Sequence, residues 1–179
     1  MPTKHRRPSI DIRHLSIDNR YMQSFTQRAL IGVLGLFFLG LILGQIFVPI
    51  VAEDIAHQFP EVRHLVLPYS ILGIATLACF QIAATLLAGI LWRSSKGSFF
   101  SDATRTLIVA TGAACTVGFL IPAATAIHLL ATIHAGGPGV VLGLAASLIA
   151  AIGFAGLTYI ATRAFDSARF DHEELGGVI

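Results

Sequence analysis

The chain has 179 residues, of which 55% are hydrophobic and 12% are charged, and its formal net charge is +2. Soluble domains usually carry about 25% charged residues, so this composition argues against an ordinary soluble globular protein. Nearly all charges fall near the two ends and in two short connections, and four long apolar runs lie between them. This pattern is typical of a polytopic membrane protein.

The chain begins with a basic segment, residues 1–28, which holds six Lys or Arg residues. Its length and polarity differ from those of a cleaved signal peptide, whose apolar core spans about 7–15 residues. We predict that this segment is a cytoplasmic leader, partly disordered.

The four apolar runs each exceed the about 20 residues that a helix needs to cross a bilayer. None of them contains Asp, Glu, Lys or Arg. Because lipid offers the backbone no hydrogen-bond partners, such runs must be helices. We therefore predict an all-α fold in which one domain, residues 29–163, is an antiparallel bundle of four transmembrane helices. Their expected bounds are about 29–56, 65–92, 102–133 and 139–165.

The first helix should continue past its apolar run, because Glu53, Asp54 and His57 follow at helical spacing until Pro60 interrupts the helix. Glu53 and His57 also have the spacing of two metal ligands on one helix face. Because Pro60 interrupts the helix, Glu61 and His64 need not lie near Glu53 and His57. We interpret these side chains as a solvated rim and predict no metal site.

Gln45 and Gln81 are the strongest polar groups inside the first two runs. Measured along the apolar runs, Gln45 falls in the outer third of the membrane and Gln81 nearer the cytoplasm, so we expect them not to pair. The expected partners are Tyr69, Ser70 or Thr125 for Gln45, and Thr111 or Thr116 for Gln81. Such contacts would join neighbouring helices. The alternative interpretation is that both glutamines line a small-molecule pocket.

The connection between the second and third helices, "SSKGSFFSDATRTL", has two adjacent phenylalanines among polar residues. Aromatic rings are enriched where membrane meets water. We therefore predict that Trp92, Phe99 and Phe100 are interface anchors, although a protein-docking role for the phenylalanines stays open. Ser101 has the features of an N-cap for the third helix, and Asp102 suits the positive end of that helix.

The fourth helix carries small residues at every fourth position: Gly139, Gly143, Ser147, Ala151 and Ala155. Small residues let membrane helices approach closely. The stripe predicts either packing within the bundle or a lipid-exposed surface for a second copy or another membrane protein.

The distribution of positive charge predicts the orientation of the chain. Of the twelve Lys and Arg residues, all but Arg63 fall in the leader, in the connection between helices two and three, or after helix four. We therefore expect both termini, including the tail 166–179, to be cytoplasmic.

The sequence has no nucleotide-binding loop, zinc-protease motif or cysteine ligand pair. His128 is the one histidine inside an apolar run, and its position near the end of the third run predicts an interfacial side chain. We predict no catalysis, no cofactor and no direct nucleic-acid binding, with membrane lipids as the surroundings of the domain.

Three segments are similar to one protein family: "AHQFPEVRHLVLP" after the first helix, "KGSFFSDAT" after the second, and the C-terminal "HEELGGVI". Together they resemble the bacterial membrane proteins of domain-of-unknown-function family 2975, from about Leu30 to the C-terminus. The resemblance implies a four-helix membrane protein without an assigned activity, and because the family is bacterial we expect the protein to lie in the plasma membrane. Some relatives are encoded beside small helix-turn-helix regulators, which implies such a regulator as a partner.

These features lead to two functional hypotheses. The first is a non-catalytic integral membrane protein that acts through protein contacts, as the membrane partner of a cytoplasmic regulator or as an accessory subunit of a membrane complex. The alternative is a small transporter or a lipid- or small-molecule-binding membrane protein, with Gln45 and Gln81 lining its cavity.

Overall fold

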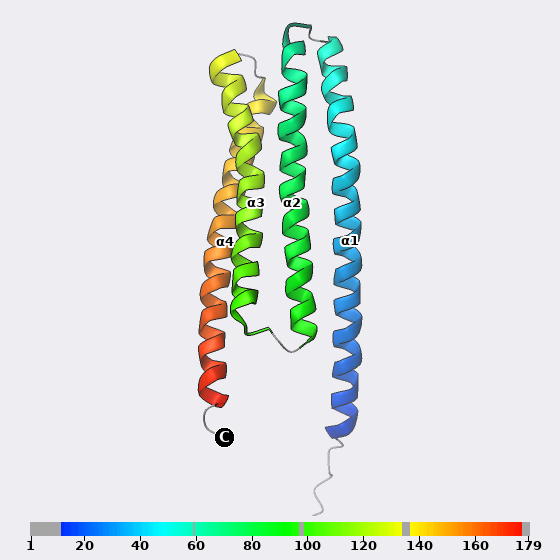
Figure 1. The fold of residues 1–179 in the computed structure, drawn as a ribbon, viewed down its shortest axis with the longest axis vertical. Coiled ribbons are helices and arrows are strands. Elements are labelled where there is room, and N and C mark those ends of the chain that lie inside the picture. The colour runs from blue at the N-terminus through cyan, green and yellow to red at the C-terminus, as the bar shows by residue number, and fades with distance from the viewer. Residues whose placement is uncertain (1–11, 59, 97–98, 134–136, 177–179) are drawn as a thin grey trace, which may run out of the picture.

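The computed structural model describes the backbone of residues 12–58, 60–96, 99–133 and 137–176. Over these residues the chain is all-α (Figure 1). Its elements are α1 (Ile12–Gln58), the 3₁₀ turn η1 (Pro60–Leu65), α2 (Val66–Ser95), α3 (Asp102–His128), the π-helical turn η2 (Leu129–Ile133) and α4 (Pro138–Gly176). The stretches Arg28–Gln58, Arg63–Ser95, Asp102–Ile133 and Pro138–Phe170 are each long and apolar enough to cross a membrane. The predicted four-helix membrane fold is confirmed.

The element bounds differ from the predicted ones at both ends of the chain. Helix α1 already begins at Ile12, so part of the predicted leader is helical, and α4 continues to Gly176 rather than ending near residue 165. The third predicted helix is divided into α3 and η2. At the other end of α1, the expected extension past the apolar run is present. The helix ends at Gln58, just before Pro60, whose ring cannot continue it.

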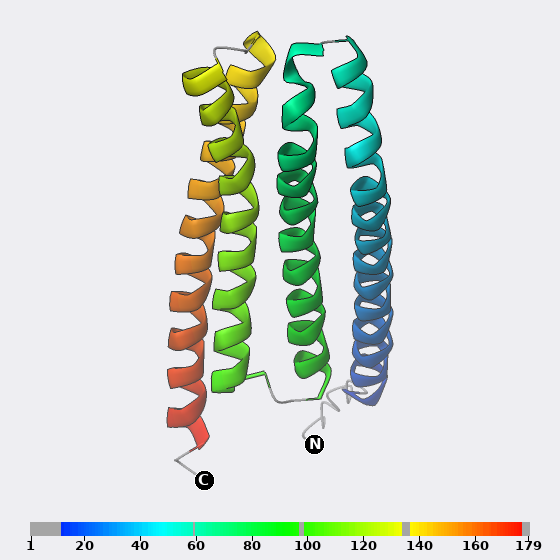
Figure 2. The same cartoon turned by 45° about the horizontal axis from the view of Figure 1, so that its top comes forward.

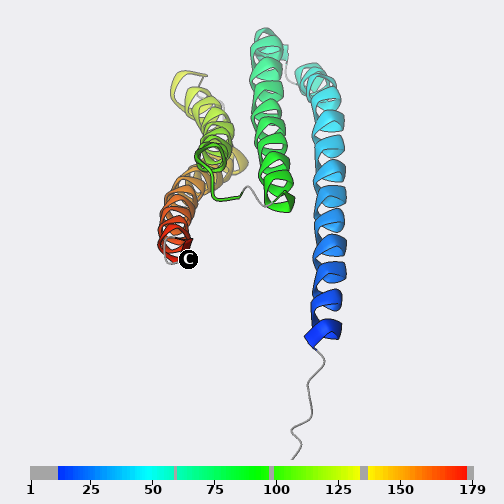
Figure 3. The ribbon, with the colours of Figure 1, turned by 60° about the horizontal axis from the view of Figure 1, so that its bottom comes forward.

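The four helices are antiparallel, and each packs mainly against its neighbour in the chain (Figures 1 and 2). Within the described residues, the extensive helix pairs are α1 with α2, α2 with α3, and α3 with α4. Figure 3 shows α1 set apart on the far side of α2 from α3 and α4. Helix α1 therefore leaves most of its apolar surface outside the bundle, as a helix surrounded by lipid can.

Small residues fill the space between the helices. The buried apolar side chains are mostly alanines, together with Cys115, whereas Leu36, Leu142 and Ile149 are each at least 70% exposed. At Gly112 of α3, an added Cβ would come within 2.6 Å of the Cβ of Thr158 on α4. At Gly118, an added Cβ would lie 3.2 Å from the Cβ of Cys79 on α2. These glycines allow α3 to lie close to both of its neighbours, since membrane helices associate through close packing.

Candidate functional site at the terminal end of the bundle

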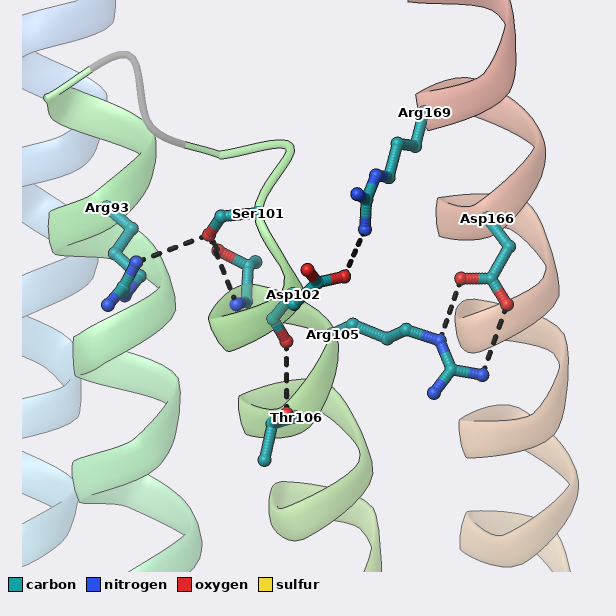
Figure 4. Close-up of polar contacts among 8 residues, drawn as sticks. Arg93, Ser101, Asp102, Arg105, Thr106, Asp166 and Arg169 are labelled. Carbon is teal, nitrogen blue, oxygen red and sulfur yellow. Dashed lines mark hydrogen bonds and ion pairs between the residues drawn. The ribbon is translucent and has the colours of Figure 1, made fainter. Parts of the chain in front are cut away.

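Among the described residues, the largest group of interacting polar side chains lies where α2 ends, α3 begins and α4 leaves the bundle (Figure 4). We call this the terminal end, because the described ends of the chain lie toward it (Figure 1). Figure 4 shows Asp102 and Arg105 on α3 directed toward Asp166 and Arg169 on α4. These side chains join two consecutive helices through residues more than 60 positions apart in the sequence.

Two ion pairs make the connection. Arg105 donates two hydrogen bonds to Asp166, from Nε to Oδ1 at 2.9 Å and from Nη2 to Oδ2 at 3.3 Å. Arg169 donates from Nη1 to Oδ1 of Asp102. We call these four residues the clamp. A fork-like arginine–carboxylate pair also fixes the orientation of its partners, so the Arg105–Asp166 pair orients these two side chains where α3 meets α4.

The two ion pairs follow from a short sequence pattern that occurs once on α3 and once on α4. Asp102 and Arg105 are three residues apart on α3, and Asp166 and Arg169 have the same order and spacing on α4. Residues three apart share a helix face. Because the two helices run in opposite directions, the Asp of each meets the Arg of the other. This repeated Asp-x-x-Arg pattern is the sequence signal for the site, which we did not predict.

The start of α3 is fixed by a second polar network. Ser101 is the N-cap, as predicted, and its Oγ accepts a hydrogen bond from the backbone N–H of Thr104 at 3.4 Å. Asp102 stands in the first turn of the helix. The Ser101 hydroxyl also lies 3.1 Å from that of Thr104, a completely buried residue, and accepts a bond from Nη1 of Arg93 at 3.2 Å. The end of α2 and the start of α3 are thereby joined.

The phenylalanines of the connection pack against α4. The rings of Phe99 and Phe100 lie with their centroids 5.6 and 6.0 Å from that of Phe165, which is only 5% exposed. This aromatic contact was not predicted from the sequence, because nothing in the connection itself points to Phe165. Phe100 remains 39% exposed, and its role as an interface anchor stays a prediction. Trp92 is 63% exposed with the Lys96 ammonium 4.9 Å from its ring centroid, which is compatible with the predicted interfacial position.

A sequence model of the family described as "Protein of unknown function (DUF2975)" matches residues 50–179 of the chain. The chain belongs to the DUF2975 family. The match confirms the resemblance seen in the sequence but begins at Ile50 rather than near Leu30, so it leaves out most of α1. No curated protein and no solved structure matches the chain. The clamp, its serine cap and its phenylalanines all lie inside the matched DUF2975 region.

The intramembrane glutamines of this DUF2975 chain are arranged differently from our prediction. Gln45 donates from Nε2 to Oε1 of Gln81 at 3.0 Å, and Gln81 donates in return to Oε1 of Gln45 at 3.4 Å. The prediction that they do not pair was wrong, because depth was measured from the ends of the apolar runs. Helix α1 continues to Gln58, and measured from the helix ends the two glutamines lie at nearly the same depth.

The partners expected for the glutamines make other contacts. The Tyr69 hydroxyl lies 2.9 Å from Nδ1 of His128, at the end of α3. Thr111, Thr116 and Thr125 each donate to a carbonyl four residues earlier in α3. Ser70 is buried, and its Oγ has no hydrogen-bond partner among the described residues.

The stripe of small residues on α4 does not form a single face in this DUF2975 chain. Gly139, Gly143 and Ala155 are exposed, Ser147 is half-buried and Ala151 is only 3% exposed. The reason is that a spacing of four residues exceeds the helical period of 3.6, so the stripe turns by about 40° at each step. No atom lies near a Cβ built on Gly139 or Gly143. The close approach between α3 and α4 is instead made at Gly112.

Proposed function

We propose that this DUF2975 membrane protein is non-catalytic and acts through protein contacts at its terminal end. Its partner is either a cytoplasmic regulator, such as a small helix-turn-helix protein, or another subunit of a membrane complex. The proposal places both termini in the cytoplasm of a bacterium and the bundle in its plasma membrane. The orientation of the termini rests on the charge distribution. The assignment to the bacterial plasma membrane rests on the resemblance to the family.

The observation that carries the proposal is the clamp. It holds α4 against the start of α3 at the point where α4 continues toward Gly176. Around it, Ser101 and Thr104 bond to each other, and Phe99 and Phe100 pack on Phe165. Side chains engaged in this way stabilise a defined surface. Such pre-organisation favours binding, because less conformational freedom is lost when a partner docks.

The glutamine arrangement supports this function over the transporter alternative. A transporter with Gln45 and Gln81 in its pathway needs both amides to face a cavity. Each amide instead bonds to the other between α1 and α2. Neither of the two cavities described along α2, one bordered by Pro49 and one by Pro122, is lined by either glutamine. The pair thus fits a helix–helix contact.

The test is site-specific photocrosslinking of the full chain in its own membrane. A photoreactive residue is placed at Ser167 or Phe170, both exposed on α4 near the clamp. Ile149 and Ile152, which are 72% and 73% exposed further along the same helix, are the matched controls. We expect adducts with a defined protein from the first pair of positions and lipid adducts from the second.

A second chain carries Asp102→Asn and Asp166→Asn, which remove the carboxylates that both arginines bind. If the clamp shapes the docking surface, the protein adducts at Ser167 and Phe170 should weaken severalfold while the control positions are unchanged. Adducts that persist at full yield would exclude the clamp from docking. A strictly monomeric protein in mild detergent, with no protein adduct at either terminal position, would overturn the proposed function.

A further inference from the structure

A cavity of about 270 Å³ lies at the opposite end of the molecule, between α1, η1 and the start of α2. Its polar lining residues are Glu53 and His57 on α1, Arg63 on η1 and Ser70 on α2. Its apolar lining residues are Pro49, Ala56, Val66 and Leu67. None of these residues takes part in the clamp, so the cavity is independent of the function proposed above.

The polar groups of the cavity are ordered by depth. Glu53, His57 and Arg63 lie close to the turn between α1 and α2, whereas Pro49 and Ser70 lie further along the two helices, toward the middle of the bundle. A ligand that fits this order has charged groups at one end and a less polar part at the other. Phospholipids at the boundary of a membrane have this same order of groups.

The charges at the rim have both signs. Glu53 is a carboxylate and Arg63 a guanidinium, both are exposed, and neither forms an ion pair within the part of the chain that the structure describes. A carboxylate attracts an ammonium group that can donate hydrogen bonds, and a guanidinium binds a phosphate through its planar set of donors. The rim is therefore complementary to a zwitterion that carries a primary ammonium and a phosphate.

The polar lining residue furthest from the rim, Ser70, is available for a hydrogen bond to a ligand. Ser70 is 6% exposed, and its Oγ has no hydrogen-bond partner among the described residues. Leaving a buried hydroxyl unpaired destabilises the protein. In a phospholipid, an ester carbonyl lies just below the headgroup, on the side of the acyl chains, and Ser70 on α2 lies further toward the middle of the bundle than Arg63 on η1 in the same cavity. The hydroxyl can donate to such a carbonyl oxygen.

The cavity is bordered by exposed apolar side chains of α2. Leu67 lines it and is 72% exposed, and Ile71, one turn further along α2, is 57% exposed. Acyl chains that leave the cavity can continue over this surface without crossing a polar barrier. This continuity favours a membrane lipid over a water-soluble zwitterion.

From this geometry we infer that the cavity between α1, η1 and α2 binds the headgroup of a phospholipid with a primary ammonium, of the phosphatidylethanolamine type. Glu53 binds the ammonium, Arg63 binds the phosphate and Ser70 donates to an ester carbonyl. Phosphatidylcholine has the same phosphate and esters, but its ammonium is fully methylated and has no N–H donor. The ammonium contact therefore distinguishes the two lipids.

The test uses the full chain, purified in detergent and freed of lipid, and native mass spectrometry of its binding to dioleoyl phosphatidylethanolamine or dioleoyl phosphatidylcholine. We expect the unsubstituted protein to bind phosphatidylethanolamine about three- to fivefold more tightly, as one exposed charged contact supplies. Glu53→Gln should abolish this preference. Arg63→Gln and Ser70→Ala should each weaken the binding of both lipids by a similar factor.

Asp54→Asn is the matched control, because it removes the same charge from the neighbouring position of α1. Asp54 does not line the cavity, and it accepts a hydrogen bond from Gln58 on its own helix. It should leave the lipid preference unchanged. Equal binding of the two lipids, or equal effects of Glu53→Gln and Asp54→Asn, would overturn the inference. Free phosphoethanolamine is the competitor. If it displaces the bound lipid completely and binds as tightly as the lipid does, the cavity is a site for a soluble zwitterion, and the choice of a lipid is overturned.

Discussion

A few polar side chains determine which positions of neighbouring helices meet in this domain, since its interior otherwise consists mainly of small apolar residues. The Gln45–Gln81 pair is the clearest case, because each amide supplies one donor and one acceptor to the other. Substituting one glutamine leaves the other amide without its partner. Substituting both removes the need for a partner altogether.

Gln45→Leu and Gln81→Leu should therefore each lower the free energy of unfolding by about 1 kcal/mol, while the double variant loses less than the sum. The measurement is a double-mutant cycle on the purified protein in mild detergent. Gln58→Leu is the control, because Gln58 bonds to Asp54 on the same helix and is exposed. Strictly additive losses would show that the two amides do not stabilise the α1–α2 contact.

The same residues show where sequence reasoning succeeds and where it stops. The helices follow from the apolar runs alone, because the bilayer fixes both their length and their hydrogen bonding. Side-chain pairing depends on depth and rotation about each axis, and a few residues of uncertainty at a helix end change both. This uncertainty led to the wrong prediction for Gln45. The clamp was predictable in principle, since Asp-x-x-Arg occurs on two antiparallel helices.

At the scale of helices, the contact between α3 and α4 is organised around Gly112 rather than around the small-residue stripe. An added Cβ at Gly112 would meet the side chain and the Cβ of Thr158. The Phe119 and Phe154 rings stack in the same contact, with centroids 5.5 Å apart. The phenylalanines fill the space between the helices, and the glycine allows them to approach.

Gly112→Ala should accordingly destabilise the protein by about 1–3 kcal/mol, the usual effect of overpacking. Gly153→Ala on α4 should be neutral or slightly stabilising, because open space surrounds that position and alanine favours a helix. Adding Thr158→Gly to Gly112→Ala should restore part of the loss. Thermal unfolding in one detergent compares all three variants, and equal effects of the two alanine substitutions would rule out a close contact at Gly112.

For the molecule as a whole, the charge distribution predicts that the terminal end is cytoplasmic and the α1–α2 turn is on the opposite side of the membrane. Cysteine labelling in intact cells tests this orientation. In a chain lacking Cys79 and Cys115, Gln58→Cys should react with a membrane-impermeant maleimide. Ser167→Cys should react only after permeabilisation. Both positions are exposed, so the reverse pattern would mean that the orientation is inverted.

The consecutive packing of the helices also bears on how the chain assembles. Each helix packs mainly on its neighbours in the chain, as far as the structure describes them. Contacts between chain neighbours need little loop closure and form quickly. The α1–α2 and α3–α4 hairpins can therefore form in the order of synthesis, each as it enters the bilayer. The clamp joins residues more than 60 positions apart, so it can close only after α4 has been made, later than the α1–α2 hairpin.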